Sequence, residues 1–178
     1  ILNLNSLKEI WFDDNQFSEF PRILTELKNL EAISFFSNNL KEIDIRKEEL
    51  PNLKYINLCY NDFKIFPTTL KHARQIERVI MWYNEVEEIP DDIYEFINLR
   101  ELNLENNNLR SVPIELSKLQ NLEKLILGQN YFTDQTISTL FEIKSLKELD
   151  LGDNEITKIS IEIGSLDSLI RLNLSNNQ

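Results

Sequence analysis

The segment LRELNLENNNL, residues 99–109, shows most clearly how this sequence folds. Leu102 and Leu104 alternate with polar residues, which is the pattern of a short β-strand that buries one of its two faces. Leu99 lies three positions before the strand pattern, Asn107 lies three positions after it, and Leu109 follows the asparagine. The segment therefore defines a frame, apolar-x-x-apolar-x-apolar-x-x-Asn, that can be sought elsewhere in the chain.

The same frame recurs along the whole chain, and one asparagine marks each copy. These residues are Asn15, Asn38, Asn61, Asn84, Asn107, Asn130, Asn154 and Asn177. They are 23 residues apart at every step except that from Asn130 to Asn154, which is 24. Because one copy cannot bury its apolar residues alone, successive copies must stack and share a core. An asparagine side chain carries two donors and an acceptor, so we expect these residues to bond the turns of adjacent coils rather than a ligand.

Proline recurs at a fixed place after the strand. Pro21, Pro67, Pro90 and Pro113 each follow their asparagine by six residues. Together with the leucine frame, this pattern resembles the leucine-rich repeat in its 23-residue class, which occurs in bacterial proteins, notably those of leptospires, and in Ras-group intracellular scaffolds. The resemblance covers essentially the whole chain. It implies an α/β fold, a right-handed solenoid with a parallel β-sheet on the concave face and short helical or irregular segments on the convex side.

We expect residues 1–178 to form a single leucine-rich-repeat domain of about seven 23–24-residue repeats with partial repeats at both ends. Leu4 and Leu7 match the closing half of an earlier repeat, whereas Asn177 and Gln178 break off just after a strand. Solenoid ends normally carry caps with a polar outer face, and neither end shows one. The sequence therefore predicts that this domain is a fragment of a longer chain.

Two repeats depart from the pattern. In the second, Asp44 replaces the proline and Lys47 falls where other repeats place a leucine, so Ile45 is expected to fill that place through a slipped turn. The sixth repeat holds the extra residue and lacks the proline. There we expect a longer helix near residues 136–141.

The composition excludes several kinds of partner. The chain has 19 Lys and Arg against 30 Asp and Glu, a formal charge of −11. Nucleic-acid backbones and anionic membrane surfaces both attract clustered cations, so neither is an expected partner. No apolar stretch is long enough to span a bilayer, so membrane insertion is not expected either.

The sequence also offers no recognisable catalytic chemistry. Its three glycines are far apart, so there is no phosphate-binding loop, and one cysteine with one histidine cannot make a disulfide or a Cys/His zinc site. Cys59 falls on the strand side and His72 on the returning limb, so we expect them on opposite faces, too far apart for proton transfer. Cys59 is interpreted as a small surface residue and His72 as a solvated one. We expect no enzyme activity, no metal and no cofactor.

The informative residues are those that the solenoid leaves free. The third, fifth, seventh and eighth positions of each frame oppose the buried leucines and should lie on the concave face or its rim. In repeats one to four, these positions gather aromatic and apolar residues, whereas later repeats offer mainly amides, glycines and acids. The predicted patch comprises Trp11, Phe36, Tyr55, Tyr60, Arg78, Ile80, Trp82 and Tyr83. Trp, Tyr and Arg are the residue types enriched at binding hot spots.

We therefore predict a protein–protein interaction module that binds a partner protein through this patch. The acidic surface, including Glu105, Asp150 and Asp153, favours a partner with some basic character. The patch could also serve self-association, or its rings could pack on one another to stiffen the sheet. The leptospiral resemblance implies a secreted or surface bacterial protein engaging host components, with a cytoplasmic location as the alternative. A second hypothesis is a regulatory or substrate-recognition domain of a larger signalling enzyme or ubiquitin ligase.

Overall fold

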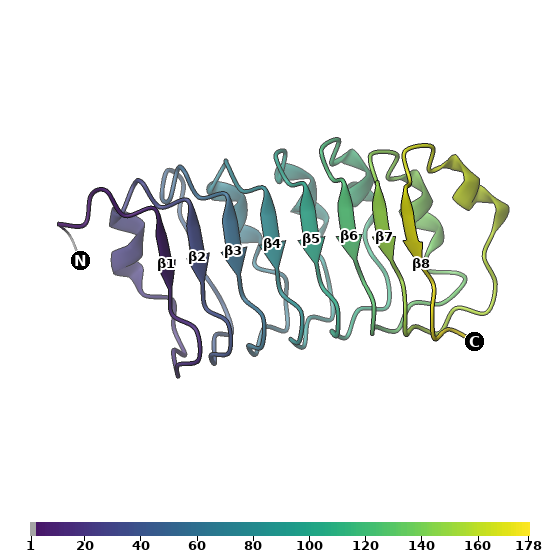
Figure 1. Ribbon diagram of the computed structural model, residues 1–178, viewed down its shortest axis with the longest axis horizontal. Coiled ribbons are helices and arrows are strands. Elements are labelled where there is room, and N and C mark those ends of the chain that lie inside the picture. The colour runs from purple at the N-terminus through teal and green to yellow at the C-terminus, as the bar shows by residue number, and fades with distance from the viewer. Residues whose placement is uncertain (1–2) are drawn as a thin grey trace.

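The computed structural model describes residues 3–178, which form one open, eight-stranded parallel sheet (Figure 1). The strands lie side by side in sequence order, and each coil returns behind the sheet to start the next strand. They are β1 (Glu9–Trp11), β2 (Ala32–Ser34), β3 (Tyr55–Asn57), β4 (Arg78–Ile80), β5 (Glu101–Asn103), β6 (Lys124–Ile126), β7 (Glu148–Asp150) and β8 (Arg171–Asn173). The chain is thus a leucine-rich-repeat solenoid whose strands line its concave face, as expected.

Short 3₁₀ helices form the other side of the coils. They are η1 (Arg22–Glu26), η2 (Thr68–His72), η3 (Asp91–Glu95), η4 (Ile114–Lys118), η5 (Ser138–Glu142) and η6 (Ile161–Ser165). Pro21, Pro67, Pro90 and Pro113 directly precede η1 to η4. Proline is suited to this place because its fixed φ directs the chain into a helical turn and its missing N–H is not needed there.

The register of the sheet aligns equal positions of successive repeats. Leu102 pairs with Val79 on one side and with Leu125 on the other, each 23 residues away. The alternating leucines point inward, where Leu102 and Leu104 have no exposed surface. Residues at one outward position therefore form columns that run across the strands, about 5 Å from strand to strand.

A ladder of buried asparagine side chains holds neighbouring coils together. In the fifth repeat, Oδ1 of Asn107 accepts the N–H of Val86 at 2.9 Å. Its Nδ2 donates to the carbonyl oxygens of Met81 in the preceding repeat and of Leu104 and Glu105 in its own, at 3.0, 3.1 and 3.1 Å. Asn38, Asn61, Asn84, Asn130 and Asn154 are buried in the same way. The bonding between adjacent coils expected for these residues is confirmed, and Asn177 also shows it, whereas Asn15 is exposed and its side chain bonds, among the described residues, only within its own coil.

The second repeat slips as the sequence indicates. Ile45 is fully buried, whereas Lys47 is exposed. Glu48 and Leu50 adopt positive φ values of 69° and 47°, and no helix forms between β2 and β3 in the described chain. The slipped turn replaces the 3₁₀ helix that follows proline in other repeats, and it still places an apolar side chain, Ile45, in the core.

The prediction of a longer helix in the sixth repeat is wrong. Helix η5 spans Ser138–Glu142 and has five residues, like the other 3₁₀ helices. The extra residue lies in the turn before it, where the N–H of Ile137 bonds to the carbonyl of Thr133 at 3.2 Å. The N–H of Thr133 donates to the hydroxyl of Thr136 at 3.0 Å, which closes this wider turn. A turn can absorb one residue without disturbing the packing of the coil.

The last coil leaves its inward side chains open to solvent. Leu172 is 40% exposed, whereas Leu149, at the same position one repeat earlier, is fully buried. Ile163 and Leu169 are partly exposed, whereas Leu140 and Leu146, at the same positions one repeat earlier, are fully buried. Whether a longer chain contains this domain stays a prediction. Within residues 3–178, no helix is long and apolar enough to cross a membrane, and no three His, Cys, Asp or Glu residues are grouped to hold a metal ion.

The asparagine ladder yields a prediction about stability. Asn107→Ala should lower the free energy of unfolding by about 3 kcal/mol, because it leaves buried N–H and carbonyl groups of two coils without partners. Urea unfolding followed by circular dichroism measures this loss. The matched control is Asn108→Ala, since that side chain is partly exposed and makes only a 3.4 Å bond. Equal losses in both variants would contradict the role assigned to the ladder.

Candidate protein-binding surface

The eighth position of every repeat has a left-handed backbone. The residues with this positive φ, between 51° and 56°, are Asp14, Ser37, Tyr60, Tyr83, Asn106, Gln129, Asp153 and Asn176. This conformation costs about 1–2 kcal/mol for most residues and is adopted most readily by Gly, Asn and Asp. The two tyrosines are the bulkiest residues in this column, so something other than backbone preference accounts for them.

Four aromatic side chains form one contiguous group, here called the aromatic cluster: Phe36, Tyr60, Trp82 and Tyr83. The rings of Tyr60 and Tyr83 are stacked, with centroids 4.4 Å apart. Trp82 meets Tyr60 edge to face at 4.8 Å, and Phe36 meets Tyr60 in the same way at 5.3 Å. Tyr60 and Tyr83 remain 40% and 43% exposed. The cluster therefore presents ordered rings to solvent instead of burying them.

Phe36 and Trp82 close over Cys59. Both belong to the seventh-position column and are two repeats apart. Side chains that pointed straight out of the sheet at these positions would be about 10 Å apart. Their ring centroids are only 6.0 Å apart. Cys59 lies between them in the column and has no exposed surface, so the interpretation of Cys59 as a surface residue is wrong. Burial raises the pKa of its thiol to about 12, which makes it unreactive at neutral pH.

The other residues of the predicted patch are arranged differently. The guanidinium of Arg78 lies over the ring of Tyr55, 4.8 Å from its centroid, and its Nε donates to Glu101 at 2.8 Å. Ile80 keeps only 9% of its surface exposed, so it is buried beneath the surface that it was expected to form. Trp11 is 53% exposed and has no ring contact with the cluster among the described residues. The structure thus brings four of the eight residues together.

A charge ladder crosses the concave face and was not recognised from the sequence. Glu101 pairs with Arg78 at 2.8 Å and with Lys124 at 3.2 Å. Glu148 pairs with the same Lys124 at 3.7 Å and accepts a bond from Nε of Arg171 at 3.0 Å. The signal was the alternation of charge down the third-position column. Such exposed pairs add little stability, but they neutralise one another.

Three carboxylates of the fifth and seventh repeats are not neutralised in this way. Glu105 follows Trp82 in the seventh-position column, and Asp150 and Asp153 come from the seventh repeat. Burial raises the pKa of Glu105, and the negative charges of Asp150 and Asp153 raise it further. A Cβ atom on Gly128 would lie 3.3 Å from Oδ1 of Asp150 and 3.8 Å from Cγ of Glu105. The two acidic side chains therefore converge above this glycine.

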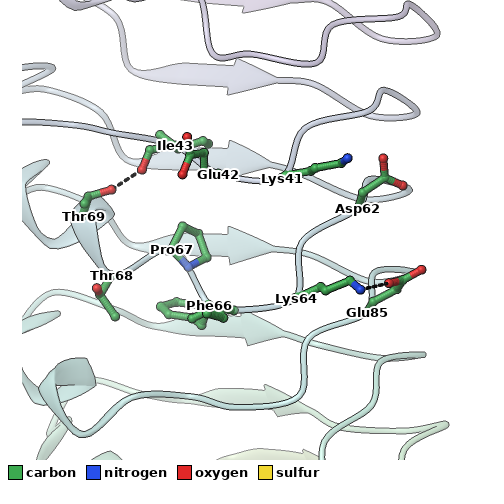
Figure 2. A pocket seen from close by; sticks show the side chains of 11 residues that line it. Lys41, Glu42, Ile43, Asp62, Lys64, Phe66, Pro67, Thr68, Thr69 and Glu85 are labelled. Carbon is green, nitrogen blue, oxygen red and sulfur yellow. Dashed lines mark hydrogen bonds and ion pairs between the residues drawn. The ribbon is translucent and has the colours of Figure 1, made fainter.

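A groove lies away from the sheet, between the second and third coils. It measures about 610 Å³ and is drawn in Figure 2. Phe66 and Ile43 contribute buried apolar side chains, whereas Ile65 is 63% exposed. Lys64 pairs with Glu85 at 3.7 Å, and the hydroxyl of Thr69 donates to the carbonyl of Ile43 (Figure 2). The groove adjoins the slipped turn of the second repeat, but its lining mixes charges of both signs and selects no particular ligand.

Cys59 and His72 lie on different sides of the coil. His72 ends η2, where its Nδ1 is 2.7 Å from the carbonyl oxygen of Ile45. Cys59 follows β3 and is covered by the aromatic cluster. The two side chains therefore do not form a nucleophile and base pair.

The repeat frame, its register and the asparagine ladder agree with comparisons of the whole chain. The family model described as "Leucine rich repeat" matches residues 74–132 and 120–178, which together make up more than half of the chain. This chain belongs to the leucine-rich repeat family. Proteins with this fold commonly serve as protein–protein interaction modules and are typically non-enzymatic.

Solved structures of leucine-rich repeat proteins superpose on nearly the whole chain. A leucine-rich repeat protein of Leptospira interrogans has 29% sequence identity and a TM-score of 0.79, and the match covers 99% of this chain and 51% of that protein. A chain described as a TDR receptor has 28% identity and a TM-score of 0.73, with coverages of 99% and 36%. This chain thus spans about half of the leptospiral protein and about a third of the receptor.

An internalin C2 of Listeria monocytogenes also has a TM-score of 0.79, with 21% identity, 98% of this chain covered and 74% of that one. At this identity the likeness concerns the fold alone. No curated protein matches the sequence.

Cys59 provides a chemical probe of the aromatic cluster. Because its thiol is buried and its pKa is raised to about 12, its reaction with Ellman's reagent at pH 8 should be at least about 100-fold slower than that of free cysteine. Trp82→Ala removes half of the cover and should accelerate the reaction at least about tenfold. Tyr94→Ala, on η3, is the control and should leave the rate unchanged. A fast reaction in the wild-type protein would show that the rings do not cover Cys59.

Proposed function

We propose that this leucine-rich repeat domain is a non-enzymatic recognition module that binds a partner protein through the aromatic cluster. The observation that carries the proposal is the exposure of stacked rings in the turns that follow β3 and β4, where Tyr60 and Tyr83 remain 40% and 43% exposed. Contiguous exposed apolar surface on a soluble protein marks a contact site more often than an accident. Trp and Tyr are also the side chains that contribute most at interface hot spots.

The backbone at Tyr60 and Tyr83 supports the same proposal. At this position six other repeats place Asp, Ser, Asn or Gln, whereas these two hold bulky rings at φ values of 51° and 55°. Strained residues gather at functional sites, where the benefit lies in binding rather than in folding. The stacking between the two rings offsets part of this strain and keeps them ordered for a partner.

The second part of the proposal concerns biological setting. We infer a bacterial protein, secreted or at the cell surface, that engages host components. This part is supported by the organism of one structural neighbour, the leucine-rich repeat protein of Leptospira interrogans with 29% sequence identity. It does not depend on the first part. The experiment below tests it separately, because the partner comes from either the host extract or the bacterial extract.

The experiment uses the triple variant Phe36→Ala, Trp82→Ala, Tyr83→Ala beside wild-type protein as baits on host and bacterial extracts. The control bait is Tyr94→Ala, Ile97→Ala, Ile114→Ala, which removes three exposed apolar side chains from the helical side of the coils. A protein retained by wild type and control but lost by the cluster variant is expected. Its purified form should bind wild type at least about tenfold more tightly than the variant, a loss typical of one hot-spot residue.

Circular dichroism should show all three baits folded, since none of the substituted residues is fully buried. Equal retention by wild type and cluster variant would contradict the proposed binding surface. A wild-type mass that rises with concentration and falls to the monomer in the cluster variant would instead identify self-association.

A further inference from the structure

The cations of the concave face are already paired with glutamates of the same face. Among the outward strand positions of residues 3–178, the basic residues are Arg78, Lys124 and Arg171, and all three belong to the charge ladder. None of them pairs with Glu105, Asp150 or Asp153. The negative charges of Glu105, Asp150 and Asp153 are therefore not neutralised by the cations of the charge ladder.

Glu105 is the carboxylate of these three that adjoins the aromatic cluster. Glu105 follows Trp82 in the same column, one strand further along the sheet. Within the described chain, neither Glu105 nor Asp153 has an ion-pair partner, and Asp150 bonds only to neutral groups, namely Asn173 at 3.0 Å and the N–H of Gly152 at 2.9 Å. Trp82 and the unpaired carboxylate of Glu105 are therefore neighbours in one column, and Asp150 and Asp153 lie two strands further along the sheet.

We propose that the partner presents a basic segment to this face, with one arginine or lysine side chain lying on Trp82 and pairing with Glu105, and a further basic residue facing Asp153, three strands along the sheet from Trp82. Apolar residues beside that cation contact Tyr60 and Tyr83. This inference rests on the proposed function and adds the chemistry of the partner.

The choice of a cationic segment follows from charge complementarity. A guanidinium or ammonium group is attracted to the face of an indole ring, most strongly when both are removed from water. Glu105 is partly buried and lies near Asp150 and Asp153, and both effects raise its pKa, so its ionised form is destabilised in the free protein. A cation from the partner would stabilise the Glu105 carboxylate, whereas an apolar or acidic partner would destabilise it further. The net charge of −11 also steers a basic segment toward the protein.

The probe for this inference is a phage-displayed library of random dodecapeptides selected on the immobilised wild-type chain. Enriched peptides are synthesised in pairs, one with each Arg replaced by citrulline or each Lys by norleucine. Their affinities are measured by fluorescence anisotropy for wild type, for Trp82→Ala and for Glu105→Gln, Asp153→Asn. The control, Glu87→Gln, Glu162→Gln, removes the same charge from exposed positions outside the concave face.

We expect enriched peptides to carry a basic residue beside an apolar one and to lose affinity at least about tenfold with Trp82→Ala. The Glu105→Gln, Asp153→Asn variant should weaken binding about tenfold at 50 mM salt and less at 500 mM, whereas the control pair should change it less than about twofold. The citrulline or norleucine peptides should not distinguish the carboxylate variant from wild type.

Stability provides a second readout that is independent of any peptide. Because the pKa of Glu105 is raised in the folded state, its ionised form lowers stability at neutral pH, and this loss disappears as the pH falls through that pKa. Glu105→Gln should therefore be more stable than wild type at pH 7, with a difference that shrinks toward pH 4. A variant less stable at pH 7 would show that Glu105 is a structural residue and overturn the inference.

The outcomes separate this inference from the proposed function. Peptides that need Trp82 but carry no basic residue, or that ignore the carboxylate variant, would overturn the basic partner and leave the aromatic binding surface intact. Peptides that ignore Trp82→Ala, or a selection that enriches nothing, would overturn both.

Discussion

The buried asparagine side chain is the interaction on which the rest of the structure depends. Asn107 joins the backbone of two coils through four hydrogen bonds, and the same residue type repeats this in each of its neighbours. Because its donors and acceptor are fixed by the turns of adjacent coils, it sets both the spacing and the register of the sheet. The regular columns on the concave face follow from that register, so the geometry of the proposed binding surface depends on the ladder.

This arrangement separates the residues that hold the fold from those available to a partner. Leucines and asparagines face inward and are buried, whereas the outward columns vary without disturbing the stack. On these columns the charge ladder neutralises one part of the face, and Tyr60 and Tyr83 occupy backbone positions that favour smaller residues. The surface bears the features of a contact site because the core does not constrain it.

Much of the fold could be predicted from the sequence, since a strict period of 23 residues fixes which positions are buried and which share a column. The same reasoning placed Ile45 in the core. The prediction failed where the burial of a residue depends on side chains from neighbouring coils. The burial of Cys59 depends on Phe36 and Trp82 leaning together, and the burial of Ile80 also depends on its neighbours in adjacent coils. The charge ladder was visible as alternation along a column, but only the register shows that those charges touch.

The most direct test of this separation is the free energy of unfolding of the double variant Tyr60→Asn, Tyr83→Asn, measured by urea titration. Asparagine accepts the left-handed backbone, and the relief of about 1 kcal/mol or more at each site should offset the lost ring stacking of about 1 kcal/mol. The account predicts a stability within about 1 kcal/mol of wild type. A loss of about 2 kcal/mol or more would show that the rings hold the coils together and would contradict their assignment to a partner.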